Sequence, residues 1–166
     1  YEELESYLDE GRDIVVVEPS VASLFVDEYE RLLDEEEYER LAERTYEVAE
    51  YINTLDAELP SIDADVYLHG HCQQRAVGQF DATERLLREG GCNVTASDVE
   101  CCGMAGSFGY KDDYYELSME VGKPLFDDIE GNDAELLACG TSCKAQISDG
   151  TGREARHPIE FIAEHL

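Results

Sequence analysis

The sequence has little positive charge. Of its 166 residues, 12 are lysine or arginine, and three of these are lysine, against 40 aspartate and glutamate residues, for a formal net charge of −28. No basic stripe is present that could neutralise phosphates, so we expect no nucleic-acid partner. Repulsion among so many carboxylates is screened in molar salt, where the Debye length is about 3 Å. The composition therefore favours a protein from a high-salt cytoplasm over an ordinary acidic domain.

Long apolar runs are also missing. No run approaches the roughly 18 residues that span a bilayer, and no basic-then-apolar leader opens the chain. We therefore expect no transmembrane segment and a cytoplasmic location, at most peripheral at the membrane. The length fits one domain over residues 1–166. Because the chain starts at Tyr1 rather than at methionine, we expect a fragment of a longer protein.

Short apolar runs alternate with amphipathic stretches, a pattern typical of β-α units. We expect strands at 14–17, 66–68, 92–99 and 136–138, and helices from Ser20 toward Leu32 and at 38–55, 80–87, 112–128 and 158–162. The predicted fold class is α/β, with a mainly parallel sheet flanked by helices. In such sheets, sites are built outside the carboxyl ends of the strands.

Cysteines follow three of the expected strands, although six cysteines in all are too few for a disulfide scaffold. Cys72 follows the second strand, Cys101 and Cys102 follow the third, and Cys143 follows the fourth. Because the carboxyl ends of parallel strands meet at one edge of the sheet, these thiols are expected to converge there. In a reduced compartment, such a cluster indicates metal binding or redox chemistry.

Thiolates select zinc or iron–sulfur clusters among the common metals. Here 28 residues separate Cys72 from Cys101 and 36 separate Cys102 from Cys139, so the close pairs typical of zinc are missing and a cluster is favoured. The glycines that follow Cys102 let the backbone approach such a group and offer N–H donors to its sulfurs. A zinc-stabilised domain without redox activity stays open as an alternative.

Two histidines and one further cysteine are weaker candidates. His69 and His71 flank the Cys72 turn, where either could ligate a metal, donate a hydrogen bond to the site or cap a strand end. Cys139 closes a strand, whereas Cys143 lies beyond it in a glycine turn with better access to the sheet edge. We therefore expect Cys143 to be a ligand and Cys139 to be a buried or spare thiol.

Four segments carry a resemblance to a known family: His69-Gly70-His71-Cys72, Cys101-Cys102-Gly103 continuing to Tyr110, Gly140-Thr141-Ser142-Cys143, and His157-Pro158. Over about residues 14–166, the chain resembles the cysteine-rich CCG domain. This domain occurs in heterodisulfide reductase subunits, in the iron–sulfur subunit of anaerobic glycerol-3-phosphate dehydrogenase and at the C-terminal end of FAD-linked D-lactate or glycolate oxidases. The motifs look most like those of the last group.

The resemblance implies an iron–sulfur electron-transfer module of an oxidoreductase. We expect one [4Fe–4S] cluster bound by Cys72, Cys101, Cys102 and Cys143, with Cys139 and His71 as further candidates. The expected electron donor is a flavoprotein domain or subunit that holds FAD and oxidises a 2-hydroxy acid or glycerol 3-phosphate, and a separate acceptor lies downstream. No catalytic residue is expected on this chain.

The sequence departs from the family pattern at three places. The family's Glu-Pro-Ser-Cys turn is Glu18-Pro19-Ser20-Val21, Gln73 follows the first expected ligand where a histidine is common, and the closing Cys-x2-Cys is reduced to Cys143 with Cys139 one position early. These departures disfavour a five-cysteine, noncubane cluster that acts on disulfides, as in heterodisulfide reductase. That thiol–disulfide module stays the alternative within the family.

Overall fold

A central parallel sheet carries the cysteine-bearing segments in the computed structural model, which describes residues 1–55 and 57–166. Its strands are β3 (Asp65–His69), β4 (Asn93–Ala96) and β5 (Glu135–Ala138), in the order β4-β3-β5. Leu68 pairs with Ala96 of β4 and with Leu137 of β5, so all three strands end at the same edge. The expected α/β class with parallel strands flanked by helices is confirmed.

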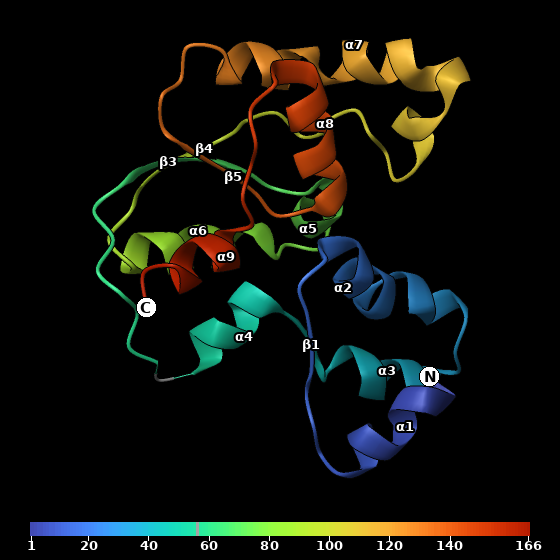
Figure 1. The fold of residues 1–166 in the computed structure, drawn as a ribbon. Helices are drawn as coiled ribbons and strands as arrows, with labels where there is room; N and C mark the ends of the chain where they lie inside the picture. Colours follow the sequence, from blue (N-terminus) through green and yellow to red (C-terminus); the bar gives the residue numbers. More distant parts are fainter. Residues whose placement is uncertain (56) are drawn as a thin grey trace.

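A second, smaller parallel pair lies in the N-terminal third (Figure 1). It consists of β1 (Ile14–Val16) and β2 (Thr45–Glu47). The helices of this part are α1 (Glu2–Asp9), α2 (Pro19–Val26), the short 3-10 helix η1 (Glu28–Arg31), α3 (Glu35–Ala42) and α4 (Val48–Thr54).

The single helix expected at 38–55 is wrong, because β2 divides it into α3 and α4. Thr45 donates its hydroxyl to the Leu41 carbonyl at 2.8 Å, and the Glu47 carboxylate accepts from the Ala49 N–H at 2.9 Å. These side-chain contacts close one helix and open the next, while Thr45 and Tyr46 pair with β1.

Helices cover both faces of the central sheet (Figure 1). They are α5 (Cys72–Ala76), α6 (Phe80–Glu89), η2 (Phe108–Tyr110), α7 (Asp112–Ile129), α8 (Thr141–Thr151) and α9 (Pro158–Ala163). Val66 and Leu68 of β3 pack with α6 and α9, whereas Tyr67 packs with α7 and α8 on the other face. The strand's alternation therefore divides the core into two layers.

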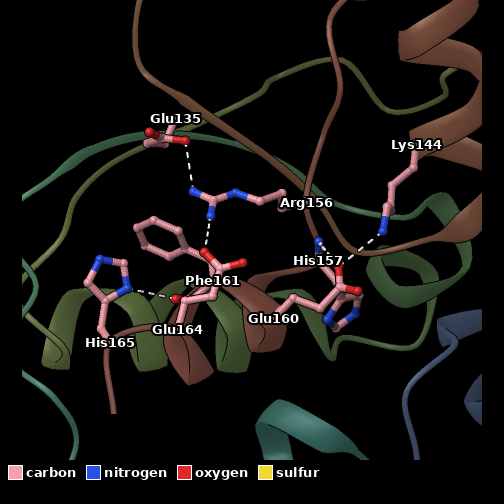
Figure 2. A network of polar contacts seen from close by, with 8 residues as sticks. All are labelled: Glu135, Lys144, Arg156, His157, Glu160, Phe161, Glu164 and His165. Atoms are coloured by element: carbon pink, nitrogen blue, oxygen red, sulfur yellow. Dashed lines mark hydrogen bonds and ion pairs between the residues drawn. The ribbon is translucent and has the colours of Figure 1, made fainter.

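A polar network fastens α9 to the sheet and to α8 (Figure 2). The Arg156 guanidinium forms ion pairs with Glu135 at the start of β5 and with Glu164 after α9. Lys144 of α8 reaches Glu160 of α9 at 3.1 Å. Because these pairs are exposed, each contributes little alone, on the order of 0 to 1 kcal/mol. Together they tie α9 to the sheet and to the helix that carries Cys143.

Within the described residues, the structure contains no helix with the length and apolar character that crossing a membrane requires.

The formal charge of −28 leads to a prediction about salt. We expect the urea midpoint of unfolding to rise steeply as KCl increases from low millimolar to molar concentration, because screening relieves repulsion among the carboxylates. Urea titrations at fixed pH in a KCl series measure this. NaCl at matched ionic strength is the control for a specific cation effect, and a midpoint constant across the series would contradict the prediction.

Candidate metal centre

The cysteine-bearing segments lie at the carboxyl ends of the three central strands, as the sequence predicts. Cys72 is the first residue of α5, which begins three residues after β3 ends. Cys101 and Cys102 follow β4. Cys143 lies in the first turn of α8 rather than in a flexible glycine turn, so a helix rather than loop freedom holds it at the sheet edge.

Three of the cysteines share a cavity. Cys72, Cys101 and Cys102 line a hollow of about 280 Å³. Cys143 is 1% exposed, and its sulfur lies within 4.8 Å of that of Cys102. All six cysteines lie in the described part of the chain, and none forms a disulfide. The structure thus brings together the four thiols expected from the sequence, and their role as ligands stays a prediction.

The two thiols at the deep end of the site affect each other's pKa. Hydrogen bonding to Cys143 lowers the pKa of Cys102, and the same bond raises the pKa of Cys143. The loop that follows supplies backbone donors, since the Gly103 N–H lies 3.4 Å from the Cys101 sulfur. The backbone N–H of Met104 also favours the Cys102 thiolate. This agrees with the donor-rich loop expected from the glycine pattern.

His69 lies behind the thiol pair. It is 0% exposed, and one of its ring nitrogens lies within 4.8 Å of the sulfurs of both Cys102 and Cys143. Neither ring nitrogen has a hydrogen-bond partner among the described residues. From the sequence either histidine could ligate, and His71 rather than His69 was the further ligand candidate. In the structure His69 is the last residue of β3 and shares the face of Tyr67, on which Cys102 and Cys143 pack, whereas His71 lies beyond the strand at the start of α5.

His71 lines the cavity and is already engaged. It is the N-cap of α5, and its Nδ1 accepts from the Gln73 N–H at 3.2 Å. Its Nε2 lies 3.4 Å from the Ser142 hydroxyl. Burial lowers the pKa of His71. The helix-capping contact explains the position of this ring, and its candidacy as a ligand stays a prediction.

Cys139 lies on the other face of the sheet from the thiol pair. It is 1% exposed and packs in the layer of Leu68 and Phe80, not in the layer of Cys102 and Cys143. Burial raises the pKa of the Cys139 thiol to about 12. This is the placement of a buried thiol without access to the cavity.

Glu18 connects the N-terminal part to this site. Its carboxylate lines the cavity and accepts from the Thr141 N–H at 3.0 Å, at the start of α8. Partial burial raises the pKa of Glu18, but hydrogen bonds from Thr141 and Ser20 and the nearby His71 together outweigh burial, and the net shift is downward. Since Gly140 offers no side chain at the N-cap position, Glu18 supplies this acceptor from 123 residues away. Sequence reasoning did not find it, because no local pattern pairs the two positions.

A buried carboxyl near Cys139 makes stability depend on pH. Burial raises the pKa of Glu47 from 4.5 to about 7, so the folded state holds a proton there that the unfolded state releases at lower pH. Stability from this group is therefore lost as pH rises from about 4.5 to 7, by an amount on the order of 2 to 3 kcal/mol. We expect Glu47→Gln, which keeps an acceptor for the Ala49 N–H, to be more stable than wild type at pH 8 and equal to it near pH 4.5. Urea unfolding of both proteins across this range measures the difference, and parallel pH curves would contradict the prediction.

Comparison with known proteins identifies the segment that bears the site. Residues 67–148 match the model of a family described as CCG, cysteine-rich domain. This segment of the chain is a CCG domain. The resemblance expected from the sequence is confirmed over these residues. The CCG domain contains His69 and all four of the converging cysteines, whereas Glu18 and Ser20 of the cavity wall lie outside it.

Two kinds of curated relative extend the comparison beyond the CCG domain. The chain is 37% identical over 111 residues, 65% of its length, to a subunit of the anaerobic glycerol-3-phosphate dehydrogenase of Escherichia coli strain K12. It is 23% identical over 166 residues, 98% of its length, to the D-2-hydroxyglutarate dehydrogenase of Pseudomonas putida. The corresponding enzyme of Escherichia coli strain K12 is 27% identical over 165 residues, 93% of the chain. The chain spans 28% of the glycerol-3-phosphate dehydrogenase polypeptide and 16% of each D-2-hydroxyglutarate dehydrogenase.

Proposed function

We propose that this chain is the iron–sulfur electron-transfer module of a flavin-linked dehydrogenase. The observation that carries the proposal is the convergence of four thiols, from Cys72, Cys101, Cys102 and Cys143, beyond the ends of three parallel strands. Four thiolates supply one ligand to each iron of a [4Fe–4S] cluster. When bound, such a cluster accepts and releases single electrons.

The residues present fit this group. The donors are soft thiols, one of them with a lowered pKa, and backbone N–H groups of the loop after Cys102 point at their sulfurs. A fully buried imidazole without a hydrogen-bond partner among the described residues, His69, faces the same place. Cys72 and Cys101 are half-buried on the cavity side, which gives an electron donor a short route to the site.

The flavin and the substrate belong to the rest of the enzyme. The relatives are named for glycerol 3-phosphate and for D-2-hydroxyglutarate, which is a 2-hydroxy acid. We infer that the partner of this chain is a flavoprotein domain or subunit that oxidises one of these two substrate classes. A preference for glycolate or D-lactate stays a prediction from the motifs. The proposed location is cytoplasmic or peripheral at a membrane.

Metal analysis tests the proposal. Protein purified and reconstituted anaerobically with iron and sulfide is expected to hold about four irons per chain and to absorb broadly near ~400 nm. The matched control is Cys92→Ala, which removes a buried thiol packed with Leu86 and Val94 in the layer away from the thiol pair and keeps the iron content. One zinc per chain without iron uptake would contradict the proposal.

Zinc is the competing occupant that a specific observation favours. His69, Cys102 and Cys143 offer one nitrogen and two sulfurs, all within 4.8 Å of one another, which is the donor set of a single zinc ion. The same metal analysis separates the two occupants. A redox titration in the presence of a disulfide substrate separates electron transfer from the thiol–disulfide alternative, because only the latter consumes the substrate.

A further inference from the structure

The position of His69 follows from the alternation of β3. Val66 and Leu68 face one layer of the core, so Tyr67 and His69 face the other. On that face His69 meets Cys102 and Cys143, and its register partner Ala138 of β5 lies beside it. The imidazole is thus held at the end of the central strand, where His69 pairs with β5.

Burying an imidazole destabilises the folded protein unless its ring nitrogens have hydrogen-bond partners. A buried polar group without a partner is unfavourable, because it has lost its hydrogen bonds to water. A neutral imidazole always carries one N–H, and His69 has no hydrogen-bond partner among the described residues. The sulfurs of Cys102 and Cys143 are the soft acceptors within 4.8 Å of its ring nitrogen.

We propose that the ring N–H of His69 donates a hydrogen bond to the sulfur of Cys102 and thereby raises the reduction potential of the group bound at the site. The inference rests on the proposed function for its redox consequence only. Because the four thiolates already supply one ligand to each iron, His69 is not needed as a ligand. It acts through Cys102, as a positioning residue. Cys102 is the acceptor rather than Cys143 because the His69 side chain contacts the Cys102 sulfur.

The direction of the effect follows from charge. Reduction adds an electron to the site, and a hydrogen bond to a ligating sulfur stabilises the more negative state.

The first test measures the reduction potential of reconstituted protein. His69→Phe removes the donor and keeps a ring of similar size, and we expect iron content to be unchanged and the one-electron equilibrium to shift about tenfold toward the oxidised form, which is 59 mV for one electron. His69→Gln or His69→Asn, each with a side-chain N–H, is expected to recover part of the shift. Tyr67→Phe is the matched control, since it alters the same face of β3 but removes only a hydroxyl that contacts Asp128.

Three outcomes would overturn the inference. If the reduction potential of His69→Phe equals that of wild type, the proposed hydrogen bond does not act on the site. If neither His69→Gln nor His69→Asn recovers part of the shift in potential, the shift comes from altered packing. Loss of one iron in four, with conversion to a three-iron cluster, makes His69 a ligand instead. Each of these leaves the electron-transfer proposal standing, because wild type still binds its cluster.

The second test does not need the cluster. In iron-free protein labelled with 15N at histidine, the His69 ring N–H, assigned by its loss in His69→Phe, is expected to exchange slowly with water and to shift when Cys102 is replaced by alanine. Cys92→Ala is the control and leaves the signal in place. A His69 signal that ignores the Cys102 substitution would overturn the hydrogen bond even if wild type bound no iron.

Discussion

Cys143→Ser is expected to abolish iron binding, whereas Cys139→Ser retains nearly all of it. Cys143 stands in the first turn of α8 with its sulfur against that of Cys102, and a serine hydroxyl is a poor ligand for iron. Cys139 faces the opposite layer of the core, where its thiol meets Gln74 and Thr83 rather than the cavity. Iron and sulfide per chain after anaerobic reconstitution measure the effect.

The two variants control each other because both replace a buried sulfur by oxygen within five residues of chain. Far-UV circular dichroism of the iron-free proteins establishes that each is folded before iron is measured. Retention of iron by Cys143→Ser together with its loss from Cys139→Ser would move the site to the other face of the sheet, and the ligand assignment would have to be redrawn around Cys139.

Gly103→Ala is expected to destabilise the protein by about 3 kcal/mol or more and to prevent cluster binding. Gly103 has φ +93°, and a Cβ atom there would lie 2.1 Å from the Ser118 carbonyl oxygen and 2.8 Å from the Gly122 nitrogen. Both obstacles are backbone atoms of α7, so neither moves cheaply. The Ser118 hydroxyl also donates to the Gly103 carbonyl at 2.9 Å, which fastens the loop after the two cysteines to this helix.

Gly106→Ala is the matched control for Gly103→Ala. Gly106 also has a positive φ, +68°, but a Cβ there meets nothing within 4 Å. Its expected cost is about 1 kcal/mol, from the left-handed backbone alone. Urea unfolding of the iron-free proteins and iron content after reconstitution compare the two. Equal destabilisation by both substitutions would contradict the close contact between the loop and α7.

The sequence predicts at which edge of the sheet the site lies, but not which side chains point toward it. A strand followed by a cysteine is a local pattern, so the convergence of Cys72, Cys102 and Cys143 could be predicted from three such patterns and the parallel sheet alone. Which side chain points to which layer depends on the exact strand bounds. With those bounds, alternation places Cys139 in the layer of Leu137 and His69 in the layer of Tyr67, yet short runs such as 136–138 do not define them. Cys143 lies in α8, where strand alternation does not apply.

The secondary structure predicted from the sequence was wrong where side-chain contacts interrupted a regular helical or strand pattern. The spacing over 38–55 fits a helix throughout, and only the contacts of Thr45 and Glu47 with the backbone reveal the strand between α3 and α4. After β5, the glycine at position 140 indicated a flexible turn, but it is the N-cap of α8. Its cap acceptor, Glu18, comes from a distant segment, and no local signal could have announced it.

The contact between Glu18 and Thr141 has a consequence for where this protein can be cut. The CCG domain begins at residue 67, yet one wall of the cavity and the acceptor for the first turn of α8 come from the turn between β1 and α2. A chain shortened to residues 67–148 would keep the cysteines and lose the carboxylate that holds the helix of Cys143. The CCG domain and the set of residues that form the site therefore have different boundaries. A minimal redox module has to include the N-terminal residues that line the cavity.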